Sequence, residues 1–198
     1  MTRLFLPLIA LVLLLLTNCG GDRMAHHVGS QTVYFDVDTT SWLTFDPTPV
    51  QEYANQQSQL SPTAPPEVFE SYSKSGEFQM PIIAAAYARM PSSVPFSKFA
   101  ALYGGGGSSM NEEIQQRLND NPTAVLKGIK VGEPSFDHAR KTVTFRTRGM
   151  LLDQPVEVIS TLFLRGSMVF SFTATYLPDQ EAIIAEDYTR MISSFELE

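Results

Sequence analysis

The chain has 198 residues and a formal net charge of −7, from 21 acidic and 14 basic side chains. This balance argues against a nucleic-acid-binding protein, which needs a surplus of Lys and Arg. The 13 Phe, 7 Tyr and 1 Trp argue against a disordered chain. The single cysteine excludes a disulfide within the chain, so stability must come from a hydrophobic core, for which the length suffices.

The first residues have the composition of an export signal. Arg3 precedes an apolar run over residues 4–16, shorter than the roughly 20 residues of a membrane-spanning helix. The run ends at Leu-Thr-Asn-Cys, which resembles the lipobox of bacterial lipoproteins. In those proteins the cysteine receives diacylglycerol and becomes the N-terminus. We therefore expect a signal peptide over residues 1–18 and acylation of Cys19, palmitate included. An uncleaved signal anchor and a buried cysteine are the alternatives.

The lipobox resemblance also implies a location in the bacterial cell envelope. Gly20 follows the cysteine where Asp would retain an enteric-type lipoprotein at the inner membrane, so we expect the outer membrane, facing the periplasm. The acidic domain gains nothing from anionic lipid, so the lipid anchor would supply the membrane contact. Residues 19–28 lack periodicity and predict a lipidated tether, and residues 29–198 predict one domain.

In the first half of the chain, the spacing of apolar residues and the positions of prolines predict the helices and strands. Pro49 suits the first turn of a helix, and Gln51 three residues after Thr48 would complete a capping box. The predicted order is a strand over 32–38 and a short strand over 42–45 that together form a hairpin, a helix from 48 to about 60, a break over 61–66, a helical or extended piece over 68–72, and a buried strand over 80–90.

The second half has the clearer pattern. It predicts a helix over 96–103, a loop over 104–107, a helix from 109 to about 118, strands over 141–148, 156–164 and 168–176, and a helix over 181–192. The three strands read as an antiparallel meander with one face on a core. Ile184, Tyr188 and Met191 form one stripe of the last helix, which we expect to pack across the sheet.

This order of elements resembles the PsbP-like fold, and within it the DcrB-like bacterial lipoproteins. The resemblance rests on three segments, Phe35 through Trp42, Val169 through Ala174 and Met191 through Phe195. It implies an α+β domain, an α/β/α sandwich around an antiparallel sheet. It also implies a non-enzymatic accessory or assembly protein that docks on a larger membrane complex, and it transfers no catalytic residue and no cofactor.

Four glycines form the most distinctive loop. Gly104, Gly105, Gly106 and Gly107 precede a predicted helix and would suit an anion-binding turn. A phosphate-binding loop would end in Gly-Lys-Ser or Gly-Lys-Thr, which is missing here. We interpret the glycines as a mobile loop that is a candidate contact for a protein partner.

The histidines and carboxylates do not form a recognisable catalytic set. His26 and His27 with Asp36 or Asp38 would suit a metal, but neighbouring residues of a tether are poorly preorganised. His138 is the one histidine in the predicted domain, and the Gly-x-Ser-x-Gly motif of hydrolases is missing. We interpret the carboxylate pairs Asp36 with Asp38 and Glu67 with Glu70 as solvated, and expect no catalytic residue and no metal site.

Basic side chains on one predicted strand are candidates for a docking patch. Arg146 and Arg148 share the polar face of the strand, with Lys141 near its start. Ordinary solvated sheet residues are the alternative interpretation. Trp42 is either a core anchor or an interface residue, and we expect it in the core.

These observations predict a non-catalytic accessory or assembly factor at a membrane. A lipid anchor would raise the effective concentration of the domain near a protein partner, so that a weak interface suffices. The alternative is a periplasmic carrier of a small hydrophobic ligand, bound in a pocket between the last helix and the sheet.

Overall fold

The computed structural model describes residues 22–58, 66–104, 116, 120, 126–151 and 153–198. Its elements are β1 (Asp22–Val28), β2 (Gln31–Val37), β3 (Leu43–Thr44), α2 (Thr48–Ser58), β4 (Glu67–Ser73), β5 (Ile82–Arg89), α3 (Phe96–Gly104), β6 (Leu126–Val131), β7 (Ser135–Asp137), β8 (Thr142–Leu151), β9 (Gln154–Arg165), β10 (Met168–Tyr176), η1 (Pro178–Gln180), α5 (Glu181–Ser194) and β11 (Glu196–Leu197). The α+β class predicted from the sequence is confirmed. Within the described ranges, none of the helices is both long and apolar enough to span a bilayer.

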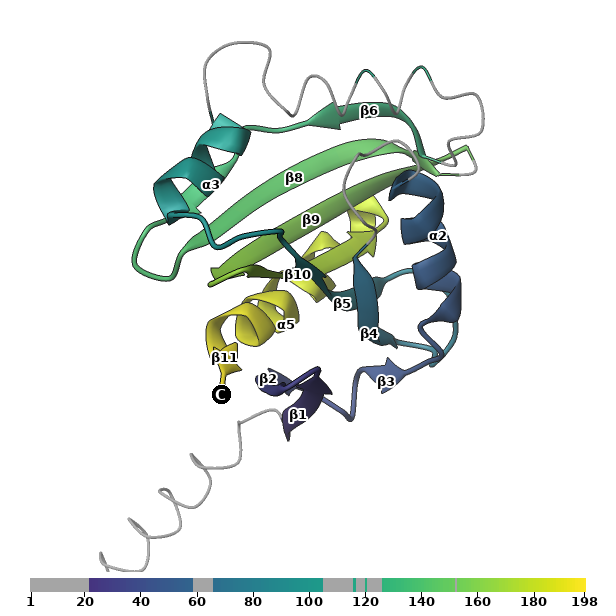
Figure 1. Ribbon diagram of the computed structural model, residues 1–198. Helices are drawn as coiled ribbons and strands as arrows, with labels where there is room; N and C mark the ends of the chain where they lie inside the picture. Colours follow the sequence, from purple (N-terminus) through teal and green to yellow (C-terminus); the bar gives the residue numbers. More distant parts are fainter. Residues whose placement is uncertain (1–21, 59–65, 105–115, 117–119, 121–125, 152) are drawn as a thin grey trace, which may run out of the picture.

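A large antiparallel sheet of eight strands forms the centre of the domain (Figure 1). Its order is β3-β4-β5-β10-β9-β8-β6, with β7 paired to β8. The predicted meander is confirmed as β8, β9 and β10, which pair in sequence order. Gly166 makes the tight turn between β9 and β10 with a φ of +63°, a left-handed conformation that glycine adopts without strain.

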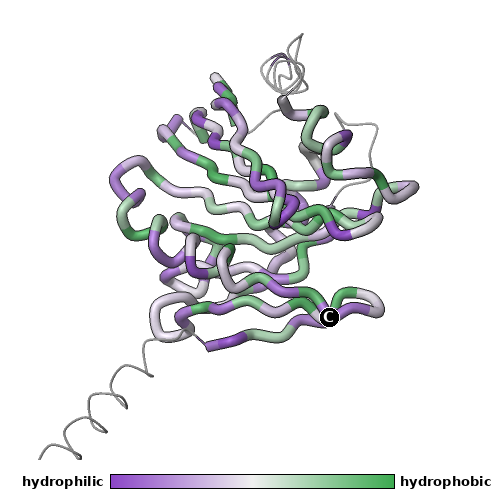
Figure 2. The backbone as a smooth tube through the Cα atoms, turned by 90° about the vertical axis from the view of Figure 1, so that its left-hand side faces the viewer, coloured by the Kyte–Doolittle hydropathy of each residue, from purple (hydrophilic) through white to green (hydrophobic). Residues whose placement is uncertain are grey.

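A second sheet of three strands lies apart from the first, in the order β1-β2-β11. It forms the lowest layer of the domain in Figure 2. The expected tether over residues 19–28 is wrong for its described part, because Asp22–Val28 forms β1 and pairs with β2 along its whole length. The amphipathic pattern missed β1 because most of its side chains are exposed or half-buried. Its inward-facing side chains are Met24, His26 and Val28, of which Val28 is buried in the hydrophobic core and Met24 packs against it.

The hairpin predicted between residues 32–38 and 42–45 is also wrong. The backbone N–H groups of Ser41 and Trp42 donate to the carbonyl of Asp38, and this turn leads the chain away from β2. The short strand β3 then pairs with β4 in the large sheet. Trp42 is 2% exposed, so its expected position in the core is confirmed.

The main core lies between the two sheets and includes one face of α5 (Figure 1). The predicted stripe of α5 is confirmed, since Ile184, Tyr188 and Met191 are all buried. The Tyr188 hydroxyl donates to the backbone carbonyl of Phe172 at 2.8 Å. This bond satisfies a buried polar group and fixes α5 on β10.

A second cluster covers the opposite face of the large sheet. Phe96, Phe99 and Ala100 of α3 pack against Val143 of β8 and Leu164 of β9. The meander therefore has both faces covered, where its sequence pattern predicted one. Along β9, neighbouring side chains point to opposite faces, and both Leu164 and the residue before it are buried.

Helix α2 confirms the helix predicted from residue 48, but its first turn is capped by a different residue. The Asp46 carboxylate accepts hydrogen bonds from the Thr48 backbone N–H at 2.9 Å and hydroxyl at 2.7 Å. Gln51 does not cap the helix. Its amide donates to the Pro66 carbonyl at 2.9 Å and accepts from the Val68 N–H at 2.7 Å, which fastens α2 to β4.

The predictions for the remaining segments had different outcomes. The segment 68–72, predicted as helical or extended, is part of strand β4, and the buried strand predicted over 80–90 is confirmed as β5. Strands β6 and β7 were not predicted. The helix predicted over 109–118 lies outside the described residues except for Gln116.

Candidate docking surfaces

Some of the predicted site residues cannot be placed. Cys19, Gly105, Gly106 and Gly107 lie outside the described residues. Gly104 is the last residue of α3, and a Cβ there would lie 2.8 Å from the Phe136 ring. Gly104 therefore allows a close approach between α3 and β7, and its contact with a partner stays a prediction.

The three basic candidates do not form one patch. Lys141 lies in the turn before β8, whereas Arg146 is five residues further along, about 17 Å on an extended strand. Arg146 Nη1 lies 2.6 Å from Glu181 Oε1 of α5, and Arg148 Nε lies 3.0 Å from Glu157 Oε1 of β9. The two arginines thus belong to an ion-pair cluster, and Lys141 belongs to a different surface.

The ion-pair cluster of Arg146, Arg148, Glu157 and Glu181 extends from the middle of β8 to the first residue of α5. The hydrogen bond to Glu181 raises the pKa of Arg146. The side chain of Glu157 is 12% exposed, whereas that of Arg148 is 71% exposed. Two cations balance two carboxylates here, so the cluster offers a charged rim with Arg148 as its most accessible member.

His26 is held by other side chains and does not form the metal site considered from the sequence. Its Nδ1 lies 3.2 Å from Glu70 Oε2 and its Nε2 lies 3.4 Å from the Tyr72 hydroxyl. The ring also stacks on Phe35, with centroids 4.7 Å apart. His26 therefore connects the small sheet to β4. Across the described ranges, no three His, Cys, Asp or Glu side chains are grouped as metal ligands would be.

The paired carboxylates have separate partners. Asp38 accepts hydrogen bonds from Thr40, which lower the pKa of its carboxyl. A bulge in β4 separates Glu67, which accepts a hydrogen bond from Tyr87, from Glu70 beside His26. Glu67 and Glu70 therefore bind different side chains and do not act as a pair.

His138 packs edge-on against Phe96, with ring centroids 5.3 Å apart. This contact places it beside the start of α3, on the side of the large sheet opposite α5. The contact that the structure gives His138 is therefore an aromatic packing contact with Phe96.

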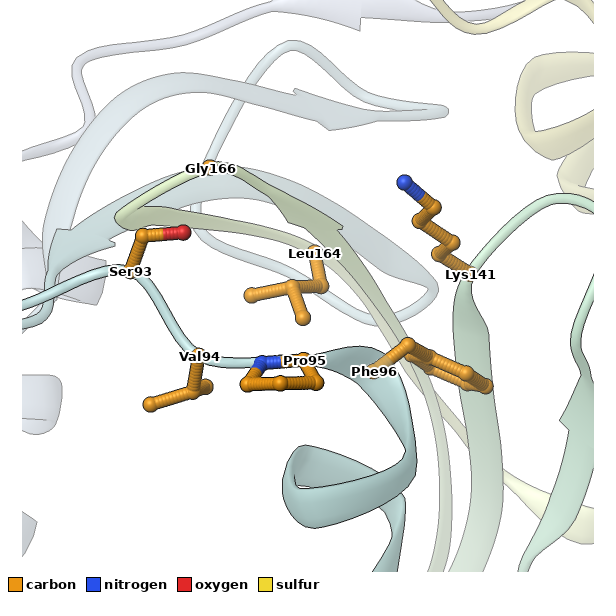
Figure 3. Close-up of a pocket in the computed structure, with 7 residues that line it drawn as sticks. All are labelled: Ser93, Val94, Pro95, Phe96, Lys141, Leu164 and Gly166. Atoms are coloured by element: carbon orange, nitrogen blue, oxygen red, sulfur yellow. The ribbon is translucent and has the colours of Figure 1, made fainter.

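A surface depression of about 470 Å³ lies at the start of α3 (Figure 3). Its described lining consists of Ser93, Val94, Pro95, Phe96, Lys141, Leu164 and Gly166. The carrier hypothesis placed its ligand elsewhere, between α5 and the sheet. There, the buried side chains of Ile184, Tyr188 and Met191 fill the space instead.

The domain thus joins a large antiparallel sheet to helices on it and to a small sheet formed with the first strand. No protein-family model and no curated protein sequence matches the chain. Solved structures of low sequence identity share the arrangement, and two of them match about nine-tenths of the chain. The fold is that of the PsbP-like proteins, as the sequence resemblance predicted.

The first of these is the solution structure of cyanobacterial PsbP (CyanoP) from Synechocystis sp. PCC 6803. It has a TM-score of 0.56 and 12% identity, over 89% of this chain and 92% of that chain. The second is the crystal structure of LpqN, involved in cell envelope biogenesis of Mycobacterium tuberculosis. It has a TM-score of 0.52 and 11% identity, over 91% of this chain and 92% of that chain. At such identities the likeness concerns the fold.

Proposed function

We propose that the protein is a lipid-anchored accessory or assembly factor of the bacterial cell envelope, attached through diacylglycerol on Cys19 and acting without catalysis. The lipobox-like segment and the PsbP-like fold support this proposal together. LpqN, which shares the fold, is described as involved in cell envelope biogenesis. The function would be to bind a protein partner at the membrane, with the outer membrane as the expected location.

The observation that carries the proposal is the position of β1. The strand begins at Asp22, three residues after Cys19. Three residues reach at most about 11 Å. A lipid on Cys19 would therefore hold the folded domain against the bilayer, where the concentration of membrane-bound partners is high.

The charged rim around Arg148 is the candidate contact for that partner. Arg148 is mostly exposed, and Glu157 orients its guanidinium at 3.0 Å. Charged groups at the rim of an interface steer association and set specificity more than they add affinity. A weak interface of this kind suits a tethered protein, because the anchor supplies the effective concentration.

Intact-mass analysis of the protein extracted from membranes tests the anchor. Wild-type protein should begin at Cys19 and carry the mass of diacylglycerol, with or without a further acyl chain. Cys19→Ser, which keeps the side-chain size, should carry no lipid and retain the Trp42 fluorescence of the folded domain. An unmodified Cys19 in wild-type protein would overturn the anchoring proposal.

Site-specific photocrosslinking tests the partner contact. A crosslinker in place of Arg148 should capture one membrane-complex protein, whereas a crosslinker in place of the exposed Glu186 of α5 should not. In the Cys19→Ser background the yield should fall and should recover when the domain is supplied at higher concentration. Equal capture from both positions would contradict a specific contact at Arg148.

A further inference from the structure

We propose that an apolar patch near the start of β1 rests on the bilayer surface, in contact with zwitterionic lipid. The patch consists of Leu43 of β3, Phe45 just after this strand, and Phe78 in the segment between β4 and β5. This inference deepens the proposed function and rests on its lipid anchor at Cys19. The anchor alone would leave the domain free to turn, whereas a second contact through the patch gives it one orientation on the membrane.

The three side chains of the patch form one continuous surface. Leu43 and Phe45 are two residues apart on an extended segment and therefore point to the same side. The ring centroids of Phe45 and Phe78 lie 6.2 Å apart, and a Cβ on Gly76 would lie 3.3 Å from the Leu43 Cβ. Leu43 is nevertheless 47% exposed and Phe78 is 55% exposed. Exposed apolar surface of this kind is typical of contact with a membrane or a protein.

The position of the patch favours the membrane. The Thr39 hydroxyl donates a hydrogen bond to Oδ2 of Asp22, which ties the segment leading to β3 to the first residue of β1. Leu43 follows Thr39 by four residues, a reach of at most about 14 Å, and Cys19 precedes Asp22 by three, a reach of at most about 11 Å. Figure 1 shows β1, β2 and β3 together at the lower side of the domain. A lipid on Cys19 would therefore bring the bilayer next to the patch.

The charges beside the patch favour zwitterionic over anionic lipid. Glu77 and Asp46 each adjoin an aromatic residue of the patch in the sequence. Hydrogen bonds from Thr48 lower the pKa of Asp46, so this carboxylate is ionised at neutral pH. Lys74 lies in the same segment as Glu77, but its ammonium is 3.2 Å from the Asp187 carboxylate and so already has an anionic partner. The local charge would repel an anionic head group and tolerate one that carries both charges.

Fluorescence quenching tests whether the patch enters the bilayer. Phe78→Trp keeps a large aromatic side chain, and the wild type gives the background, since its one tryptophan, Trp42, is 2% exposed. The full chain is reconstituted in vesicles of phosphatidylcholine and phosphatidylethanolamine with lipid brominated on its acyl chains. The added tryptophan should lose about half or more of its emission, because apolar surfaces at the interface reach roughly 5–10 Å into the acyl boundary. Replacing part of the lipid with phosphatidylglycerol should weaken the quenching.

Leu102 of α3 provides the matched controls, because it is 49% exposed and lies on a helix far from β1 and β3 (Figure 1). Leu102→Trp should not be quenched. In the Phe78→Trp background, Leu43→Asp should reduce the quenching, whereas Leu102→Asp should leave it unchanged. Both substitutions are at exposed positions, so both variants should keep similar melting temperatures. Equal quenching at positions 78 and 102, or quenching that Leu43→Asp does not change, would overturn the proposal.

Intact mass of the same samples separates this proposal from that of the anchor. If wild-type Cys19 carries no lipid, its thiol can be coupled to a maleimide-bearing lipid, because it is the one cysteine of the chain. The same quenching is then expected. A missing acyl group would refute the anchor alone, and an unquenched tryptophan at position 78 of acylated or coupled protein would refute the membrane contact of the patch alone.

Discussion

The indole Nε1 of Trp42 donates a hydrogen bond to Oδ2 of Asp187, 2.8 Å away, and so joins the segment between the two sheets to α5. The ammonium of Lys74 lies 4.2 Å from the indole ring centroid and 3.2 Å from the same carboxylate. The side chain of Asp187 is only 18% exposed. This carboxylate thus satisfies a buried donor and a neighbouring cation together.

Asp187→Ala should lower the free energy of unfolding by about 2 kcal/mol, because the buried indole N–H would lose its acceptor. Asp187→Asn keeps an acceptor oxygen and should cost about half as much. Glu186→Ala is the control, since this side chain is 85% exposed and its ion pair with Arg190 should contribute less than about 0.5 kcal/mol. Urea unfolding followed by Trp42 fluorescence measures all three. Equal losses at both positions would contradict the role of the Trp42–Asp187 bond.

His26 and His27 are adjacent but should respond differently to truncation. His26→Ala removes the stack on Phe35 and the contacts with Glu70 and Tyr72, and should cost about 2 kcal/mol of stability. His27 is exposed, with a 3.3 Å contact to the Thr32 hydroxyl, so His27→Ala should change stability by less than about 0.5 kcal/mol. Urea unfolding of the two variants side by side checks this, and a His27 effect as large as that of His26 would refute it.

Alkaline pH should destabilise the domain through its half-buried tyrosines. Burial raises the pKa of Tyr53 and Tyr103 to about 12 from the ordinary value of 10.0. The unfolded chain therefore loses these protons first, and the stabilisation that is full below pH 10 declines as the pH rises towards about 12. Phenolate absorbance and unfolding free energy measured across this range should change together. Tyr103→Phe should flatten the decline, and a decline of unchanged steepness in that variant would count against this assignment.

Arg140 stabilises the C-terminal end of α5. Its Nη2 donates to the carbonyls of Ile192 at 2.7 Å and Ser193 at 3.2 Å, where helical carbonyls lack partners within the helix. Arg140→Ala should cost about 1–2 kcal/mol, measured by urea unfolding. Arg148→Ala, at a side chain 71% exposed, should cost less than about 0.5 kcal/mol. A larger loss of stability in Arg148→Ala than in Arg140→Ala would contradict the role of Arg140 at the end of α5.

Local patterns in the sequence predicted the parts of the fold whose own side chains carry the signal. The alternation in β10 and the stripe of Ile184, Tyr188 and Met191 each report a buried face directly. Strand β1 carries a weaker signal, since only Val28 of its side chains is buried while Met24 and His26 are half-buried. The partner of β3 was also missed, because a two-residue strand is defined by its neighbour rather than by its sequence.

The candidate sites depend on contacts between residues that are far apart in the sequence, and a local pattern cannot predict such contacts. Arg146 and Arg148 are two residues apart on one strand, so the sequence places them on the same face. Their carboxylate partners come from α5 and β9, which the sequence does not reveal. The depression at the start of α3 is likewise formed by three separate segments, at residues 93–96, 141 and 164–166.

The position of β1 has a mechanical consequence. Asp22 lies at the open end of the β1–β2 hairpin, opposite Val37, so force applied through the preceding residues reaches this edge strand first. A pull away from the sheet would peel the backbone pairs one after another from Asp22. The contacts of His26 with β4 would resist that peeling partway along the strand. Because β2 also pairs with β11, β2 would keep a backbone partner on its other edge while β1 yields.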